Sequence, residues 1–385
     1  MTAQWYDRSN LEDLVIPENE FSQKAIAYFL PLIRQGVSSY IQNVESDLGL
    51  VQVDDLVFPV TVNSKEYQNS YVVSPYTHYV SYAEEELGKL RKPWLEAMLR
   101  PVIRVLGGLL RLGSVNRVVI VNNWLFSTNL YPQISEGQIQ QIVALLQARF
   151  PSHAIVFRSV YPIEGQVDSR WARARLVFSR QVYFWKGLKV TQDLSRDFKL
   201  LARSTHTVES LSSTLDESSD RSGLFDRLTT LYRALYIQKY SRLNPQYLPQ
   251  FWEHALKTRA LSIQLLKNAD CHSMDVSSIE GFCTFFDVGQ TTSSPAIGYE
   301  VARPQKLGLY RMVEALSFRR SMDRHSQMNL SAGAPQFKRA RGGVAQIEYM
   351  AVFTEHLSGL RDAPWWLLQK IANGLALSLV QENEL

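Results

Sequence analysis

The spacing of apolar residues along this chain predicts both strands and helices. The clearest pattern in the N-terminal half is a β-α-β unit. It has a buried strand over 117–121, an amphipathic helix over 136–150 and a returning strand over 154–160. Such a unit implies parallel pairing or a crossover connection.

Two further patterns precede this unit. Residues 48–62 are extended in character, and 82–112 are rich in helix formers. Because proline lacks the backbone N–H that a helix needs, Pro93 and Pro101 are expected to divide this second segment into separate helices.

The C-terminal half begins with an amphipathic helix over 225–240. It then shows three hairpin-connected strands, a helix and two more extended segments, predicted over 261–266, 279–286, 296–302, 309–324, 327–331 and 346–353. Both halves therefore read as strand, helix, strand, short basic segment and strand, which favours a tandem pseudo-repeat.

A polar segment separates the two halves. Residues 206–224 are dense in Ser, Asp and Glu and can bury little apolar surface, so they predict a linker on the surface. The expected organisation is an N-terminal domain over 1–205 and a C-terminal domain over 225–385. The expected fold class is α/β (α+β), each domain having a mixed central sheet flanked by helices.

Composition narrows the class of protein. A chain of 385 residues with 45% hydrophobic content can bury two cores. Its net charge of +4 suits an anionic ligand better than a nucleic acid. The chain has two cysteines, which are not spaced as metal ligands usually are. They therefore predict neither a disulfide framework nor a metal site. No leader or membrane-span pattern stands out, so we expect a cytoplasmic protein.

The segment QKLGLYR at 305–311 joins an extended run to the helix at 309–324. The first backbone N–H groups of a helix lack acceptors inside it, and the helix dipole is positive there. Gly308 would let an anion approach the backbone, and Lys306 and Arg311 add positive charge, as does Arg303. The turn therefore predicts a site for a diphosphate, although its spacing matches neither the Walker loop nor the dinucleotide fingerprint.

This turn resembles the acyl-donor loop of the GNAT acyltransferases, with Gln305, Gly308 and Tyr310 in the three signature places. The phrases KYSRLNPQYLPQFW, GFCTFF, IGYE, NLSAGAPQFKRARG and IEYMAV further resemble the FemAB and BioF-like group, in which two GNAT-like domains are joined. The resemblance covers about 225–356 and implies a degenerate N-terminal domain and a C-terminal domain with the donor loop.

The resemblance implies binding roles for further residues. Leu309 would present its backbone amide to the donor, and Asn329 and Ser331 would bond the pantetheine amides, in the gap that GNAT folds leave between their fourth and fifth strands. Tyr310 replaces the usual small residue. This departure would limit how deeply a pyrophosphate enters and would indicate a phosphopantetheine arm on an acyl carrier protein instead.

Acyl transfer to an amine requires a base and a proton donor for the thiolate. Glu300, just before the loop, is the first candidate for the base, and Glu348 is the second. Tyr349 or Tyr310 would protonate the thiolate. A covalent alternative would use Cys283 with His254, His325 or His356, although a buried inert thiol is more frequent in an apolar strand.

The acceptor is expected to meet the segment NNWLFSTNLYP, which follows a strand in the N-terminal half. Its polar and aromatic candidates are Asn122, Asn123, Trp124, Asn129 and Tyr131; the alternative is a loop whose side chains cap its own backbone. A second basic set would dock a carrier protein or the 3′-phosphate of coenzyme A, or would be a solvated surface: Arg319, Arg320, Arg324, Lys338, Arg339 and Arg341.

The predicted function is an N-acyltransferase that moves an acyl group from acyl-CoA or an acyl carrier protein to a small polar amine by direct attack. One alternative is a FemAB-type transferase that uses aminoacyl-tRNA, for which donor affinity would depend steeply on salt. The other is a non-catalytic GNAT-like binding protein.

Overall fold

The computed structural model describes residues 3–88, 93–161, 168–187, 189–213, 223–270 and 276–378. The chain forms two compact units. The first comprises Met1–Arg180, Ser241–Gln246 and Ile347–Asn383, and the second comprises Gln181–Tyr240, Tyr247–Gln346 and Glu384–Leu385. The division falls inside two strands, β6 (Arg175–Trp185) and β13 (Val344–Phe353).

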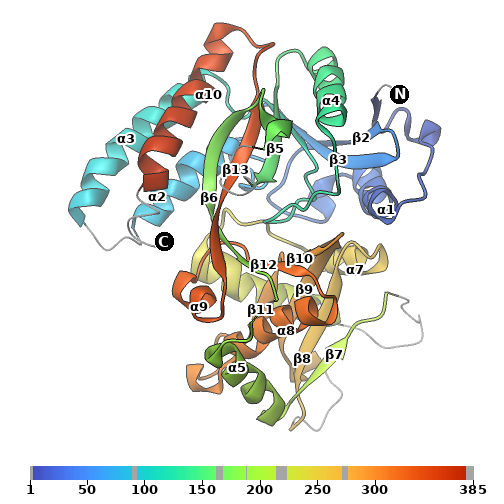
Figure 1. The fold of residues 1–385 in the computed structure, drawn as a ribbon, viewed down its shortest axis with the longest axis vertical. Coiled ribbons are helices and arrows are strands. Elements are labelled where there is room, and N and C mark those ends of the chain that lie inside the picture. The colour runs from blue at the N-terminus through green and yellow to red at the C-terminus, as the bar shows by residue number, and fades with distance from the viewer. Residues whose placement is uncertain are drawn as a thin grey trace. The chain divides into compact units, whose positions relative to one another are not determined.

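The first unit is built on a mixed sheet (Figure 1). Besides β6 and β13, its strands are β1 (Gln4–Tyr6), β2 (Asp47–Val53), β3 (Leu56–Asn63), β4 (Val118–Val121) and β5 (Ala154–Val160). Its helices are α1 (Glu20–Gln35), α2 (Tyr82–Leu87), α3 (Pro93–Leu112), α4 (Glu136–Arg149) and α10 (Gly359–Ile371), with π-helical turns at Thr77–Ser81 and Ala372–Ala376.

Helices cover both faces of this sheet, which explains its uninterrupted apolar strands. In β4, Val119 and Val121 belong to the cluster that α4 covers, whereas Val118 and Ile120 belong to the cluster that α3 and α10 cover. Successive side chains of a strand point to opposite faces, so a sheet buried on both faces requires apolar residues at every position.

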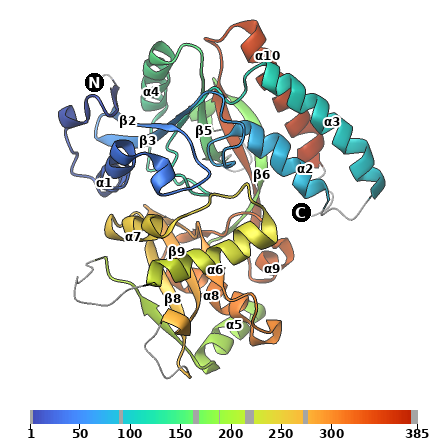
Figure 2. The same ribbon diagram turned by 180° about the vertical axis from the view of Figure 1, so that it is seen from behind.

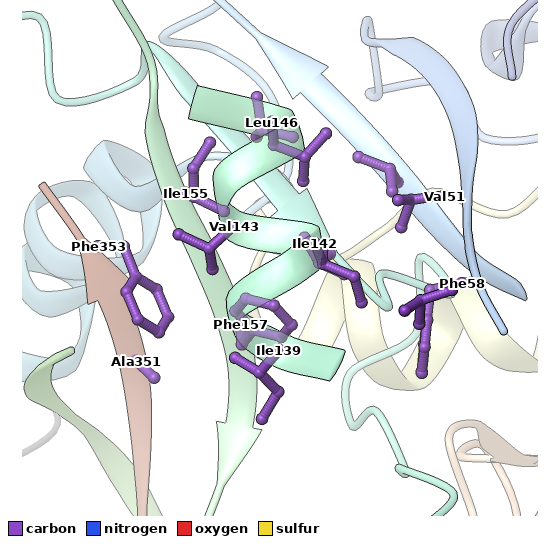
Figure 3. Close-up of a cluster of buried hydrophobic side chains, with 14 of the residues drawn as sticks. Val51, Phe58, Ile139, Ile142, Val143, Leu146, Ile155, Phe157, Ala351 and Phe353 are labelled. Atoms are coloured by element: carbon purple, nitrogen blue, oxygen red, sulfur yellow. The ribbon is translucent and has the colours of Figure 1, made fainter. Parts of the chain in front are cut away.

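The predicted β-α-β unit is confirmed. β4 pairs with β5 in parallel, and α4 connects them. Figure 3 shows the buried face of α4, including Ile139 and Val143, against Ile155 and Phe157 of β5 and Phe353 of β13. The first core therefore includes a strand from the far end of the sequence.

The second unit has its own mixed sheet, seen from behind in Figure 2. Its strands are the end of β6 with β7 (His206–Ser210), β8 (Ser262–Asn268), β9 (Ile279–Val288), β10 (Thr291–Ser293), β11 (Ile297–Tyr299) and β12 (Gln327–Asn329). Its helices are α5 (Gln192–Arg203), α6 (Leu224–Tyr232), α7 (Pro249–Lys257), α8 (Leu309–Asp323) and α9 (Pro335–Ala340). A π-helical segment at Arg233–Tyr240 extends α6.

The two sheets repeat the same pairing scheme. In the first unit β1, β2, β3 and β4 pair antiparallel in turn, β4 pairs with β5 in parallel, and β5 pairs with β13 antiparallel. In the second unit β7, β8, β9 and β10 pair antiparallel, β10 pairs with β12 in parallel, and β12 pairs with β6 antiparallel. This order confirms the fold class and the tandem repeat that the sequence predicts.

The sixth strand of each scheme comes from the other half of the sequence. Residues 349–353 of β13 pair in the first unit, and residues 184–185 of β6 pair in the second. The compact units therefore differ from the predicted ranges 1–205 and 225–385, because 181–205 belong to the second unit and 347–383 to the first.

Local predictions differ from the structure at three places. Residues 206–210 of the predicted linker form β7, which pairs with β8, whereas 214–222 lie outside the described residues. The strand predicted over 296–302 is regular only over 297–299. Pro101 does not divide α3: it lies on the exposed side of the helix, where the carbonyl that loses its partner can bond to water.

Candidate functional site

The predicted donor turn has the backbone geometry of an open helix start. Gln305–Leu307 form a single 3-10 turn, which the bond from Gly308 N to Gln305 O closes at 3.0 Å. Gly308 has φ +76° and is the N-cap of α8, and no side chain caps the helix. Residues with a Cβ rarely adopt this φ, so glycine is needed here. The amides at 309–311 therefore have no acceptor within the helix.

The N-terminus of the corresponding helix in the first unit is capped. At the start of α4, Ser135 accepts a hydrogen bond from the amide of Gln138, whose side chain bonds back to the N-cap backbone. This capping box satisfies the donors that α8 leaves free. An anion could thus be held at the start of α8 but would find the start of α4 occupied.

The strands beside the turn separate from each other. β10 pairs with β12, but β11 pairs only with β9 in the described chain, so the ladder to β12 ends before the turn. The break is held by Thr284, whose hydroxyl donates to Ala296 O at 2.7 Å and accepts from Ala296 N at 3.1 Å. These bonds replace the missing ladder contacts.

Helix α5 packs against the turn. Leu200 lies so near that a Cβ on Gly308 would meet its Cδ2 at 2.7 Å. Asp197, only 1% exposed, accepts from Arg311 Nε at 2.6 Å and also from Arg341 Nε. The expectation that Arg311 supplies mobile charge is therefore wrong, because a buried carboxylate already pairs with its guanidinium.

The exposed part of the turn is Gln305 and Lys306. Next to them, the half-buried Tyr310 lies between two aromatic rings, 5.9 Å from the ring centroid of Tyr299 and 4.8 Å from that of Phe337. Burial, with the nearby charge of Glu314, raises the pKa of the Tyr310 hydroxyl. Tyr310 is therefore protonated at neutral pH.

Glu314 lies one helical turn beyond Tyr310. Burial raises its pKa above the ordinary carboxyl value, and Lys338 together with a hydrogen bond to Tyr310 only partly opposes this. Glu314 therefore keeps its proton to a higher pH than an ordinary carboxyl does. The sequence interpretation missed Glu314, whose signal is a lone carboxylate on the buried side of α8.

Asn329 and Ser331 hold the backbone after β12. The Asn329 side chain is buried and accepts from Ser331 N at 2.8 Å. Lys338 Nζ donates to Ser331 O at 3.1 Å and to Ala332 O at 2.8 Å. The structure thus gives Asn329 and Lys338 structural contacts, and their predicted contacts to pantetheine and to a carrier protein stay predictions.

Glu300 lies just before the turn, as predicted, but its carboxylate already forms hydrogen bonds with other residues. Its Oε2 accepts from Arg227 Nη2 at 3.1 Å and its Oε1 from Ala302 N at 3.2 Å. These bonds fix the turn that follows β11. Both carboxylate oxygens of Glu300 already accept hydrogen bonds, so this geometry disfavours Glu300 as the base.

Glu348 lies in the first unit rather than beside the turn. It is 2% exposed and accepts from Arg180 Nε at 2.9 Å and from Tyr161 Oη at 2.8 Å. Burial alone would raise the pKa of Glu348, but the charge and hydrogen bonds of Arg180 outweigh it and lower the pKa. The neighbouring Tyr349 points to the other face of β13 and packs in the core that α3 and α10 cover.

Further titratable groups surround Glu348. Burial, reinforced by the charges of Arg158 and Arg180, lowers the pKa of His78 to about 3, so this imidazole is neutral. His78 Nε2 lies 3.2 Å from Ser179 Oγ, and Arg180 Nη2 donates to Ser127 O at 2.7 Å. The sequence interpretation overlooked this cluster, because its members are distant from one another in the chain.

The predicted acceptor segment is part of the core. Asn122 and Trp124 are buried, with Asn122 Nδ2 donating to Leu130 O at 2.9 Å and Trp124 Nε1 donating to Asn122 Oδ1 at 2.8 Å. Asn129 is also buried and accepts from Trp124 N at 3.2 Å. These three residues therefore cap their own loop, the alternative that the sequence left open.

Asn123 and Tyr131 connect this loop to β5 and its neighbours. Asn123 Nδ2 donates to Val72 O at 2.9 Å, and its Oδ1 accepts from Arg158 Nη1 at 3.2 Å. Tyr131 Oη donates to Arg158 O at 2.6 Å. Both side chains therefore hold the buried Arg158 in place. The polar atoms that form these bonds point into the protein and not toward solvent.

The covalent alternative is disfavoured. Cys283 is fully buried, and burial raises the pKa of its thiol to about 12, despite hydrogen bonds from Ser294 and Ser317 at 3.2 Å. A protonated, inaccessible thiol is a poor nucleophile. No histidine of the described chain is among its hydrogen-bond partners.

The remaining basic residues are only partly free. Asp287 accepts from Arg320 Nη2 at 2.6 Å and lies 3.2 Å from Arg324 Nε. Arg339 lies over the ring of Tyr183 at 5.6 Å, whereas Arg319 is exposed. The predicted docking set is therefore divided among separate contacts.

No family model matches this sequence, and no curated protein does. Several solved structures are similar to it. They include the C-terminal domain of a putative lysylphosphatidylglycerol synthetase from Agrobacterium fabrum, at 13% identity over 70% of this chain and 92% of that chain, with a TM-score of 0.46. FemX matches at 9% identity over 61% of this chain and 81% of that chain, with a TM-score of 0.41.

A tandem GNAT protein from the clavulanic acid biosynthesis pathway also matches. It is 8% identical over 91% of this chain and 98% of that chain, with a TM-score of 0.39. We draw no functional conclusion from likenesses this distant. In the described part of the chain, no helix is both long and apolar enough to cross a membrane.

Proposed function

We propose that this protein is an acyltransferase that moves an acyl or aminoacyl group to the amine of a small polar acceptor. The observation that carries the proposal is the start of α8, where a left-handed Gly308 precedes amides that no side chain caps. A negatively charged donor tail would accept from these amides and interact favourably with the helix dipole. A thioester with a diphosphate-bearing arm, such as acyl-CoA, fits this chemistry best.

In the proposed reaction the amine nitrogen attacks the thioester carbonyl carbon. A C–N bond forms, the C–S bond breaks, and the thiolate leaves with a proton from the enzyme. Tyr310 is the proposed proton donor, since it follows the donor turn directly and its raised pKa keeps it protonated. Glu314 would return the proton to Tyr310 and accept the proton that the amine loses.

Lys306→Glu is expected to raise the Kd for acyl-CoA about tenfold, because it places a negative charge beside the proposed phosphate site. Lys306 is exposed, so the fold should be unaffected. Isothermal titration with non-hydrolysable acyl-CoA measures the effect. Lys65→Glu, at another exposed lysine, makes the same change in net charge and should leave Kd unaltered. Equal affinity of the Lys306 and Lys65 variants would remove the turn from the donor site.

A panel of acyl-CoA, acyl carrier protein and aminoacyl-tRNA donors with small amines, read out by thiol or tRNA release, identifies the donor class. Donor affinity that falls steeply with salt would favour aminoacyl-tRNA. Binding without release for every pair would favour a non-catalytic protein.

Tyr310→Phe is expected to lower kcat about 100-fold, since general acid catalysis typically contributes at least this much. The Kd for acyl-CoA should stay unchanged, because the aromatic ring still packs between Tyr299 and Phe337. Tyr299→Phe removes a neighbouring hydroxyl and serves as the control. A fully active Tyr310→Phe enzyme would reassign the proton donor.

A further inference from the structure

Helix α3 presents apolar side chains on both sides. Its inner side packs in the first unit through Leu99, Leu106 and Leu110, which are buried. The opposite side, called here the outer face of α3, consists of exposed large side chains: Trp94, Met98, Val102, Val105, Leu109 and Leu112. Leu112 is 84% exposed, Trp94 67% and Val105 66%.

The spacing of the outer face is regular. Its residues follow one another at intervals of three or four, so they form one continuous stripe along the helix. At 1.5 Å per residue the stripe from Trp94 to Leu112 is about 27 Å long. Scattered exposed apolar residues are ordinary on a protein surface, but a continuous apolar stripe of this length indicates a binding surface.

A neighbouring helix carries a further exposed aromatic side chain. α3 contacts α10, and both views show the two helices side by side (Figures 1 and 2). Trp366 of α10 is half exposed, and Lys370 Nζ lies 6.0 Å from its ring centroid. An exposed Trp beside a Lys is a combination typical of side chains at a membrane interface.

Basic residues outnumber acidic ones along this helix. α3 contains Arg100, Arg104 and Arg111 against Glu96, a net charge of +2, and the sequence just before it adds three basic residues that lie outside the described residues. Two copies of the chain that met through this face would bring like charges together, which disfavours a homodimer. An anionic partner is favoured instead.

We propose that the outer face of α3 binds the surface of an anionic lipid bilayer. A helix with Trp, Leu and Val on its free side and arginines along its flank lies in the plane of the headgroups, its apolar side entering the acyl region. Arg104, 68% exposed at its side chain and with its Nε 3.8 Å from Glu84 Oε1, would reach lipid phosphates from the flank of the helix. The protein then attaches peripherally.

The test is flotation of the full-length protein with vesicles of phosphatidylcholine, alone or mixed with phosphatidylglycerol. We expect the protein to float with the mixed vesicles and to remain below with the neutral ones. The double variant Val105→Glu with Leu109→Glu should bind mixed vesicles at least about tenfold less, because it places two carboxylates in the apolar stripe. Both positions are exposed, and an unchanged thermal transition would verify folding.

The control variant is Val15→Glu with Ile16→Glu, which makes the same exchange at two exposed apolar residues elsewhere in the first unit. It should float like the wild type. The proposal is overturned if the wild type ignores mixed vesicles at low salt, or if the α3 variant binds as well as the control. It is equally overturned if the wild type is a dimer that the α3 variant alone dissociates, since the face would then be covered by a second copy.

Discussion

Glu348→Gln is expected to lower the free energy of unfolding by about 3–5 kcal/mol, the range for breaking a buried ion pair by removing one partner. Glu348 is 2% exposed, and its loss would leave the guanidinium of Arg180 without its carboxylate in the interior of the first unit. Urea denaturation followed by tryptophan fluorescence and circular dichroism measures the change.

The control for this variant is Glu355→Gln. Glu355 pairs with Arg173, and both side chains are more than half exposed, so the loss should be within about 0–1 kcal/mol. Equal losses at the two positions would show that burial does not strengthen the Glu348 pair.

The same carboxylate makes the fold sensitive to acid. The folded-state pKa of Glu348 is lowered, so its contribution to stability is present above the ordinary carboxyl pKa of about 4.3 and is lost as pH falls through the folded value. His78 acts in the same direction between about pH 6.5 and its folded pKa of about 3, because only the unfolded state takes up its proton. The Glu348→Gln variant should lose less stability on acidification than the wild type.

Asp197→Asn is the second variant for which we expect a large effect, also about 3–5 kcal/mol. Asp197 is the shared partner of Arg311 and Arg341, and Arg341 is 8% exposed at its side chain. The substitution should also weaken acyl-CoA binding, because α5 would no longer fix Arg311 at the start of α8. Denaturation and titration of the same preparation measure the two effects.

Asp193→Asn is the matched control on the same helix. Asp193 pairs with Arg196 at the surface, so its removal should cost about 0–1 kcal/mol and leave donor affinity unchanged. A normal Kd in the Asp197 variant, together with lower stability, would limit the role of this carboxylate to folding.

The local elements of the fold could be predicted from sequence because their signals are local. The apolar faces of α4 and α8 repeat at helical spacing, and β5 and β9 are continuous apolar runs between turns. The exchange of β6 and β13 could not be predicted, because any strand of suitable length and polarity satisfies the same local pattern. Which sheet it enters depends on contacts that are distant in the sequence.

The candidate site shows the same limit. The backbone role of Gly308 could be predicted, because a glycine between a strand and a helix indicates a turn with a left-handed conformation. The partners of Arg311 and Glu348 have no such signal, since Asp197 and Arg180 lie more than a hundred residues away from them in the chain. The resemblance to a known loop identified the turn but could not indicate that α5 covers part of it.

The position of β13 has a consequence for biosynthesis. The strand that completes the N-terminal sheet is translated only after the chain has passed residue 344, long after the strand β5 with which it pairs. Until then β5 has an open edge, and such edges attract other chains. The nascent protein therefore has a long interval in which a chaperone would be of most benefit.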